Sequence, residues 1–217
     1  MRWGDLMFER RVDTKQEEWF ESIETAREYA EGAKKSTMKY RAFLETLKSL
    51  NIKGRYLDIG AGPGVLTVMI AQEYPDIEIT ALEVSPHMVS LGREYVEEKG
   101  LQDRIHCIPG DVNDAGLIET LGKYDLVYST YTLHHWDDPK GVIRILLGTL
   151  KDGGALFIHD LRRAWWLYCL PIQNGFFYSI RASYRASEIR EMIESMGIEQ
   201  CVVKHEFPFL LSVIIRK

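Results

Sequence analysis

The chain has 217 residues, of which 46% are hydrophobic, and a formal net charge of −5 at pH 7. This length and hydrophobic content suit one domain with a large core and leave little room for a second domain. Residues 54–159 contain 8 Lys and Arg against 16 Asp and Glu. Because binding to nucleic acid normally requires a basic surface that neutralises phosphates, the composition argues against DNA or RNA as a partner.

The three cysteines, Cys107, Cys169 and Cys201, are widely spaced. No C-x-x-C pair or His/Cys cluster indicates a metal site, so we expect small buried thiols, no metal and a cytoplasmic location. No apolar run typical of a secretory signal stands at the N-terminus. The longest uncharged run, residues 164–180, is shorter than the roughly 20 residues of a membrane-spanning helix, so it is interpreted as a lid or an interfacial patch.

Residues 1–51 are predicted to be helical. Apolar side chains recur at helical spacing over residues 14–34 and again over residues 36–50. From residue 52, short apolar runs alternate with helical patterns, which is typical of parallel strands linked by helices. The expected elements are strand 54–60, helix 63–74, strand 77–83, helix 86–99, strand 104–109, helix 114–121, strand 124–130, helix 138–150 and strand 154–159.

The remaining elements complete a single domain that spans residues 1–217. A helix-rich stretch is expected over 161–175 and a helix over 187–196, followed by strands 199–206 and 208–215. Two strands so close in sequence are joined most easily as an antiparallel hairpin. Without a linker or repeat, we expect a helical cover (1–51), a cofactor-binding core (52–160), a substrate-side insertion (161–186), and a C-terminal helix and hairpin (187–217).

The most informative motif is the run Tyr-Leu-Asp-Ile-Gly-Ala-Gly-Pro-Gly-Val-Leu-Thr over residues 56–67. It is typical of a buried strand, a glycine turn and a helix start, the unit that brings backbone close to a bound nucleotide. Gly60 and Gly62 permit positive φ or close approach of a ligand, and Pro63 suits the first turn of a helix. A cofactor can therefore lie against bare backbone.

A dinucleotide is the obvious alternative, but its G-x-G-x-x-G fingerprint is incomplete here. Val65 occupies the third glycine position. Asp58 precedes the turn, where we expect it to face the pocket, repel a diphosphate and attract a cationic ligand. S-adenosylmethionine carries a sulfonium and an ammonium and has no phosphate, so the sequence favours it.

Two further acids end the next two predicted strands. Glu83 follows an apolar run and is placed to accept hydrogen bonds from ribose hydroxyls, while Asp111 suits an adenine amino group. Each acid also has a simpler interpretation. Asp58 can cap the turn, Glu83 can be a solvated strand end or cap the helix that begins near Pro86, and Asp111 can cap the helix that begins near Asn113.

With these motifs in this order, the chain resembles class I S-adenosylmethionine-dependent methyltransferases of the small-molecule type, including those of ubiquinone and menaquinone biosynthesis. The similarity covers residues 52–160. It implies a Rossmann-like, doubly wound, seven-stranded sheet, mostly parallel with an antiparallel C-terminal hairpin. It also implies that the glycine loop holds the methionine part of the cofactor. The expected cofactor-binding residues are Asp58, Gly60, Gly62, Glu83, Met88, Asp111, Val112 and Thr130.

Residues 129–139 form the loop after the fourth core strand, and we expect this loop to open at the pocket. It lacks the Asn/Asp-Pro-Pro-Tyr/Phe signature of many nucleic-acid amino-methyltransferases. The catalytic candidates are His135, His134 and Tyr131, because histidine titrates near neutrality and an aromatic face stabilises a cation. Of the two histidines, His135 is expected to matter more for turnover. The alternative is that both histidines only pack or cap.

Arginines and aromatic residues are interleaved over residues 160–166 and 176–185. Such a surface can bind a planar or anionic acceptor by stacking and charge-assisted hydrogen bonds, or it can be an amphipathic cover with solvated arginines. The expected substrate-binding residues are Tyr40, Arg162, Trp165, Tyr178, Arg181 and Tyr184.

The sequence thus predicts transfer of a methyl group from S-adenosylmethionine to an oxygen, carbon or sulfur atom of an apolar or aromatic small molecule, with S-adenosylhomocysteine as the product. Two alternatives stay open. One is a methyltransferase of a lipid-tailed quinone at a membrane surface, where amphipathic aromatic residues would make a peripheral contact. The other is a cofactor-binding regulator without turnover. The oligomeric state stays open as well.

Overall fold

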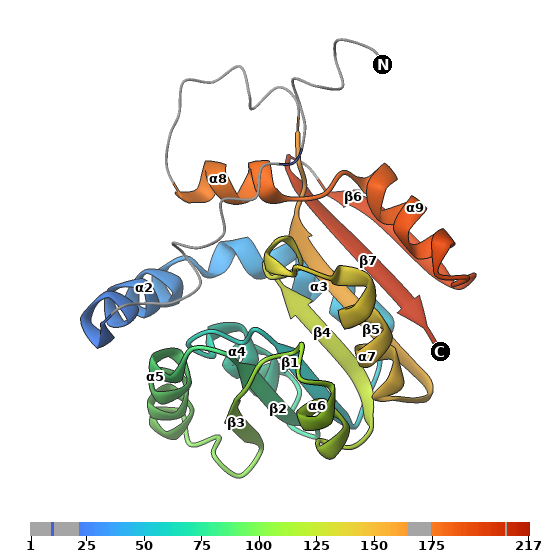
Figure 1. The fold of residues 1–217 in the computed structure, drawn as a ribbon. Helices are drawn as coiled ribbons and strands as arrows, with labels where there is room; N and C mark the ends of the chain where they lie inside the picture. Colours follow the sequence, from blue (N-terminus) through green and yellow to red (C-terminus); the bar gives the residue numbers. More distant parts are fainter. Residues whose placement is uncertain (1–9, 11–21, 165–174, 207) are drawn as a thin grey trace.

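The computed structural model describes residues 10, 22–164, 175–206 and 208–217. A seven-stranded sheet with the order β3-β2-β1-β4-β5-β7-β6 lies at its centre (Figure 1). Strands β1 to β5 run parallel, whereas β7 is antiparallel to both β5 and β6. The strands are β1 (Arg55–Ile59), β2 (Glu78–Glu83), β3 (Ile105–Pro109), β4 (Tyr124–Thr130), β5 (Leu150–Leu161), β6 (Cys201–Glu206) and β7 (Leu210–Arg216).

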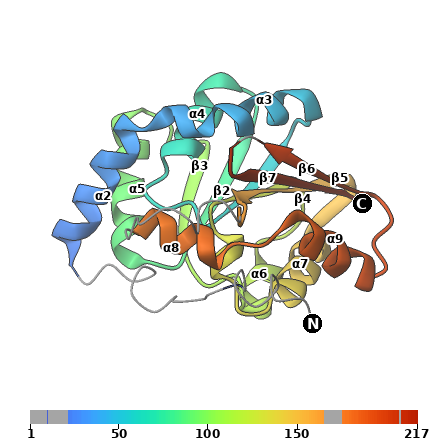
Figure 2. The same cartoon turned by 90° about the horizontal axis from the view of Figure 1, so that it is seen from above.

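Helices cover both faces of this sheet, so the predicted α/β class and the C-terminal hairpin are confirmed (Figure 2). The described helices are α2 (Ile23–Lys35), η1 (Thr37–Tyr40), α3 (Arg41–Leu50), α4 (Val65–Glu73), α5 (Pro86–Glu98), α6 (Ala115–Thr120), η2 (Leu133–His135), α7 (Pro139–Gly148), α8 (Gly175–Ala182) and α9 (Ala186–Ser195).

Two hydrophobic cores follow from the alternation of side chains along the strands. On one face, Tyr56 of β1 packs with α3 and α4, through residues such as Phe43 and Val68. On the other face, Leu57 packs in the core that includes α6, α7 and α9. Because β1 to β5 are covered on both faces, their sequences are nearly continuously apolar.

Polar caps set the starts of several helices. Side-chain oxygens of Ser22, Ser85, Asp114 and Asp138 accept backbone N–H groups in the first turns of α2, α5, α6 and α7. Such caps satisfy donors that have no partner within a helix. Since Ser85 caps α5 and Asp114 caps α6, the simpler interpretations of Glu83 and Asp111 as helix caps are wrong.

Several predicted boundaries are corrected. Helix α4 begins at Val65 after a cap at Gly64, so Pro63 precedes the helix and does not lie in its first turn. Strand β5 extends to Leu161, which removes the start of the helix-rich stretch predicted over 161–175. The strand is longer because its end pairs with β7. Residues 14–21 of the first predicted helix and residues 165–174 lie outside the described residues.

Two smaller points concern the cysteines and the membrane. Cys107 and Cys201 are half-buried rather than buried, and partial burial raises the pKa of both thiols. Cys169 lies outside the described residues. In the described part of the chain, no helix is long and apolar enough to cross a membrane.

Candidate active site

The carboxyl ends of the parallel strands lie on the same side of the sheet, and β1 and β4 are neighbours there. The chain continues from β1 outward to β2 and from β4 outward to β5, so the connections diverge between these two strands. Open α/β sheets bind ligands in the crevice at such a switch point. We call residues 60–64 the glycine loop. This loop follows β1, and Tyr131 follows β4, so both border the crevice.

The glycines of the loop serve different purposes. Gly60 has φ 72°, and a side chain there would collide with the methyl group of Thr132. Gly62 has φ 55°, and a Cβ atom there would meet nothing within 4 Å. Open space over a glycine backbone permits the close ligand approach that a nucleotide-binding turn requires.

Glu83, the last residue of β2, is tied to the glycine loop. Its Oε2 accepts the N–H of Gly62 at 2.8 Å, and its Oε1 accepts the N–H of Ser85 at 2.9 Å. Burial raises the pKa of Glu83, and these N–H donors oppose the rise. A carboxylate oxygen accepts more than one hydrogen bond, so both oxygens retain capacity for the hydroxyls of a ligand.

Asp58 lies in the core, with 2% of its surface exposed. Its Oδ2 accepts the hydroxyl of Thr67 at 2.6 Å and the hydroxyl of Tyr128 at 3.0 Å. Burial raises the pKa of Asp58 to about 7, against the effect of both hydroxyls. The geometry therefore accounts for Asp58 through partners within the fold, and its predicted contact with a cofactor stays a prediction.

The other predicted cofactor residues are dispersed around the carboxyl ends of the strands. Asp111 is exposed after β3, and its Oδ1 accepts the N–H of Asn113 at 2.8 Å. Thr130 is the half-buried last residue of β4. Val112 is buried in the core that includes α6. Met88 is buried in a cluster with Ala26, Ala30 and Leu91, which places its side chain toward α2.

Tyr131 has an uncommon backbone conformation for a residue other than glycine, with φ 59°. Its N–H donates to the carbonyl of His159 at 2.9 Å, and its hydroxyl donates to the carbonyl of Lys39 at 3.0 Å. Burial raises the pKa of its phenol. Tyr40, a predicted substrate-binding residue, has its ring centroid 6.2 Å from that of Tyr131. The structure thus brings these two predicted residues together.

His134 forms a buried pair with Asp160, the second-last residue of β5. The Nδ1 atom of His134 lies 2.8 Å from Oδ1 of Asp160, and the backbone N–H of His134 donates to Oδ2 at 2.9 Å. A carboxylate on Nδ1 fixes the orientation and tautomer of an imidazole, which leaves Nε2 as the acceptor. Asp160 was not among the predicted site residues.

His135 lies against His134, with ring centroids 4.0 Å apart. Burial, followed by the neighbouring His134, lowers the pKa of His135 to about 4. A base is most effective when its pKa lies near the working pH, so this environment makes His135 a poor proton acceptor near neutral pH.

Arg10 joins the loop that carries the histidines to α8. Its guanidinium donates to the carbonyl of His134 at 2.9 Å and to the carbonyl of Ala182 at 2.6 Å. It also lies 4.2 Å from the ring centroid of Tyr184, a predicted substrate-binding residue. Arg10 had no signal in the sequence beyond its charge, since its partners are remote along the chain.

The remaining predicted substrate residues do not converge on one point. Arg162 donates to the carbonyl of Pro208 at 3.1 Å. Tyr178 of α8 is 41% exposed, and Arg181, also on α8, is half-buried. Trp165 lies outside the described residues. The predicted residues that the structure brings together are therefore Tyr40 with Tyr131 and, through Arg10, His134 with Tyr184.

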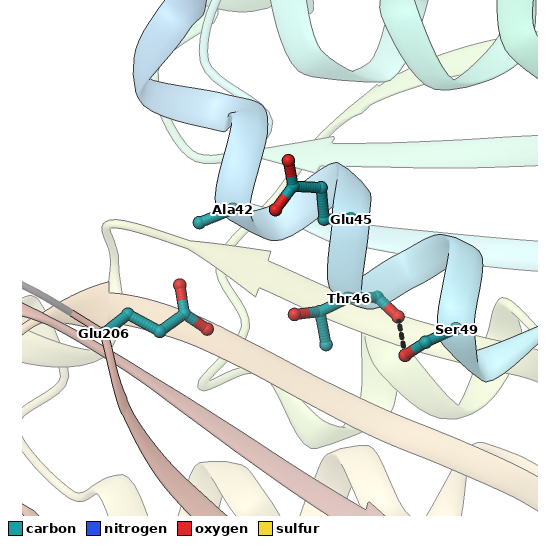
Figure 3. Close-up of a pocket in the computed structure, with 5 residues that line it drawn as sticks. All are labelled: Ala42, Glu45, Thr46, Ser49 and Glu206. Atoms are coloured by element: carbon teal, nitrogen blue, oxygen red, sulfur yellow. Dashed lines mark hydrogen bonds between the residues drawn. The ribbon is translucent and has the colours of Figure 1, made fainter.

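A groove of about 390 Å³ between α3 and β6 lies elsewhere (Figure 3). It is lined by Glu45 and Thr46 of α3 and by Glu206 of β6, together with Ala42 and Ser49. Strand β6 is at the far edge of the sheet, with β7, β5 and β4 between it and β1. This groove is therefore separate from the crevice between β1 and β4.

Comparison with known proteins agrees with this geometry. Residues 57–156 match the sequence family described as a methyltransferase domain. Malonyl-(acyl-carrier protein) O-methyltransferase of Acetivibrio thermocellus is 34% identical over 100 residues, which cover 46% of this chain and 33% of that protein. Ubiquinone biosynthesis O-methyltransferase of Xanthomonas axonopodis pv. citri is 33% identical over 109 residues, covering 50% of this chain and 44% of that protein.

The matched parts thus span less than half the length of these curated relatives. A crystal structure of a SAM-dependent methyltransferase from Aquifex aeolicus has the same fold, with a TM-score of 0.69 and 16% identity over 90% of this chain and 98% of that chain. Together with the strand order and the glycine loop, these similarities confirm the resemblance inferred from sequence, and residues 57–156 match the family described as a methyltransferase domain.

Proposed function

We propose that this chain transfers a methyl group from S-adenosylmethionine to a small-molecule acceptor and releases S-adenosylhomocysteine. The observation that carries the proposal is the open backbone at Gly62 beside the Glu83 carboxylate, at the switch point of a methyltransferase domain. A cofactor without phosphates suits this carboxylate-rich edge, whereas a diphosphate would be repelled.

The described residues fit such a cofactor. The backbone of Gly60 and Gly62 would hold the methionine part, Glu83 the ribose and Asp111 the adenine. When bound, S-adenosylmethionine supplies an electrophilic methyl group on a sulfonium. The further members of the proposed set are Asp58, Met88, Val112 and Thr130.

The residues after β4 would orient the acceptor and accept its proton. Much of the acceleration of an in-line displacement comes from alignment of the nucleophile, which the fixed ring of Tyr131 would provide as a wall. His134, held by Asp160, would take the proton of an acceptor that must ionise, and Nε2 is its free acceptor atom. His135 would pack against His134 and limit water access.

The acceptor class follows from the walls and from the relatives. Tyr40 and Tyr131 offer aromatic surface to an apolar or aromatic compound. Both relatives described above are named O-methyltransferases, which supports oxygen over carbon or sulfur as the accepting atom. Under this proposal, residues 1–51 and 161–186 select the substrate within one domain, nucleic acid is not a partner, and the protein acts in the cytoplasm.

The test is calorimetry with matched glycine variants. Wild type should bind S-adenosylhomocysteine and neither NAD nor NADP. Gly62→Ala should weaken this binding by at least 10-fold, because a methyl group occupies the space that the ligand needs. Gly100→Ala is the control, since Gly100 also has positive φ and open space around a Cβ atom. Tight NAD binding without a response to the adenosyl compound would overturn the proposal.

The two alternatives remain predictions with their own tests. Flotation with liposomes that carry ubiquinone would reveal a membrane-surface enzyme. Binding of S-adenosylhomocysteine without methyl transfer to any member of a broad acceptor library would favour the regulator.

A further inference from the structure

Lys39 of η1 carries a half-buried ammonium group at the edge of the crevice. Its Nζ atom lies 4.9 Å from the ring centroid of Tyr40 and 5.7 Å from that of Tyr131. Within the described residues, no carboxylate lies within 4.0 Å of this nitrogen, whereas the nearby Lys34 pairs with Glu31 at 2.8 Å. Lys39 is thus a cation beside two aromatic rings that has no anionic partner among the residues that the structure describes.

The two rings offset only part of the cost of burying this charge. A cation over an aromatic face gains less free energy than the desolvation of a charge without a paired anion costs. Burial accordingly lowers the pKa of Lys39. An anion that approaches the ammonium beside the rings would restore the missing interaction, and a charge-assisted hydrogen bond would form in a partly dry environment.

The backbone holds Lys39 in register with the end of β4. The carbonyl of Lys39 accepts the hydroxyl of Tyr131 at 3.0 Å, and Tyr131 keeps its positive φ through contacts on both sides. Residues held in such sparsely populated conformations are strained and cluster at ligand sites. The backbone of Lys39 is therefore held beside the end of β4, although Lys39 and Tyr131 are remote in sequence.

We propose that Lys39, Tyr40 and Tyr131 form a binding subsite for a carboxylate at the crevice between β1 and β4. The inference rests on the proposed function. Two ligands can supply the carboxylate, namely the methyl acceptor and the methionine end of the cofactor. In either case the ammonium binds the carboxylate oxygens while the two rings contact the apolar part of the ligand.

Calorimetry with two pairs of probes distinguishes these sources. The first pair is S-adenosylhomocysteine and its decarboxylated analogue, which retains the amine. The second pair is 3,4-dihydroxybenzoate and 3,4-dihydroxybenzamide, titrated into protein with and without S-adenosylhomocysteine. Wild type should prefer the carboxylate in at least one pair by roughly 10- to 100-fold, as expected for a hydrogen bond to a charged group.

Lys39→Gln should abolish that preference, and Lys39→Arg should retain most of it. Lys48→Gln is the control, because Lys48 is an exposed lysine of α3. The thermal unfolding temperature of Lys39→Gln should be no lower than that of wild type, since the substitution removes an unpaired charge. If Lys39→Gln loses the carboxylate preference in the first pair of probes, the subsite binds the cofactor. If it loses the preference in the second pair, the subsite binds the acceptor.

Equal carboxylate preference in wild type and Lys39→Gln would overturn the subsite, as would the absence of preference in both pairs. Failure of the proposed function gives a different result. In that case wild type binds neither S-adenosylhomocysteine nor its analogue, while the benzoate pair still reports on Lys39.

Discussion

The two sides of the crevice are built in different ways. On the β1 and β2 side, Gly62 and Glu83 are hydrogen-bonded across 21 positions, and the ligand-facing surface is largely backbone. On the β4 side, Tyr131 bonds to Lys39 across 92 positions and Arg10 bonds to His134 across 124. The first side is therefore a local motif, whereas the second is assembled by the tertiary fold.

Under the proposed function, this difference predicts where substrate specificity resides. A glycine loop can serve any chain that folds its strand, turn and helix, because backbone N–H groups do the binding. The β4 side depends on side chains from η1, from the loop after β4 and from Arg10. Substitutions there can change the acceptor without disturbing the loop. The predictions below separate the two sides, beginning with the largest expected effect.

The histidine loop should give the largest effect. If the acceptor is a hydroxyl, His134→Ala should lower kcat by about 10²–10⁴-fold, the usual contribution of a general base. His135→Ala should lower it less than about 10-fold, because the pKa of His135 is about 4. This ranking opposes the sequence-based expectation that His135 matters more. Steady-state kinetics from pH 6 to 9 decides between them.

Asp160→Asn is the companion variant for this test. It removes the carboxylate from Nδ1 of His134 but preserves the shape of the side chain. If His134 is the base, kcat should fall for Asp160→Asn as well, and the losses from Asp160→Asn and His134→Ala should not add. A larger loss for His135→Ala than for His134→Ala would restore the sequence-based ranking.

The sequence predicted the fold well, and it placed the candidate residues of the glycine-loop side at the ends of neighbouring strands. Each strand of the core was a short apolar run, and each of Gly60, Gly62, Glu83 and Asp111 ended or followed such a run. Their meeting at one edge follows from parallel pairing alone. A single parallel sheet therefore converts local signals into a three-dimensional site.

The β4 side could not be predicted in the same way. Asp160 belongs to β5 and Lys39 to η1, and neither residue has a pattern that points to its partner. The strand end at Leu161 was also missed, because it depends on pairing with β7. Asp58 shows the converse, since its sequence position suggested a ligand contact and its partners are the buried hydroxyls of Thr67 and Tyr128.

Asp58 gives the second prediction, which concerns stability. The pKa of Asp58 is about 7 in the fold, against about 3.9 in an unfolded chain. Between these values the folded state binds a proton that the unfolded state has lost, so the free energy of unfolding falls as pH rises. The full fall is of order 4 kcal/mol, at 1.36 kcal/mol per pKa unit. Asp58→Asn should remove it.

Urea unfolding at pH 4.5 and pH 8 measures this effect. Asp58→Asn should gain about 2–4 kcal/mol over wild type at pH 8 and little at pH 4.5. Asp125→Asn should show the opposite sign. Burial raises the pKa of Asp125, but the ion pair with Lys151 and the N–H of Arg55 lower it on balance. A loss of stability for Asp58→Asn at pH 8, together with weaker cofactor binding, would indicate a ligand role for Asp58.

Glu83 gives the smallest expected effect and tests the loop side directly. Glu83→Ala should weaken binding of S-adenosylhomocysteine by about 1.5–3 kcal/mol, as for other hydrogen bonds to a charged group. Glu78→Ala is the control, because Glu78 is the exposed first residue of the same strand. Calorimetry measures the affinity, and thermal unfolding checks that both variants fold.

Glu83→Gln then separates two roles of Glu83, namely binding of the ribose hydroxyls and positioning of the glycine loop. The amide oxygen can still accept the N–H of Gly62 or of Ser85, but the amide nitrogen cannot accept a hydrogen bond. If Glu83 acts only by holding the glycine loop, Glu83→Gln should recover much of the affinity for S-adenosylhomocysteine and for its 2′,3′-dideoxy analogue alike. If the carboxylate binds both ribose hydroxyls, wild type should lose affinity for the dideoxy analogue, and Glu83→Ala should bind the two ligands equally. Equal binding of both ligands by wild type would leave Glu83 as a residue that positions the loop.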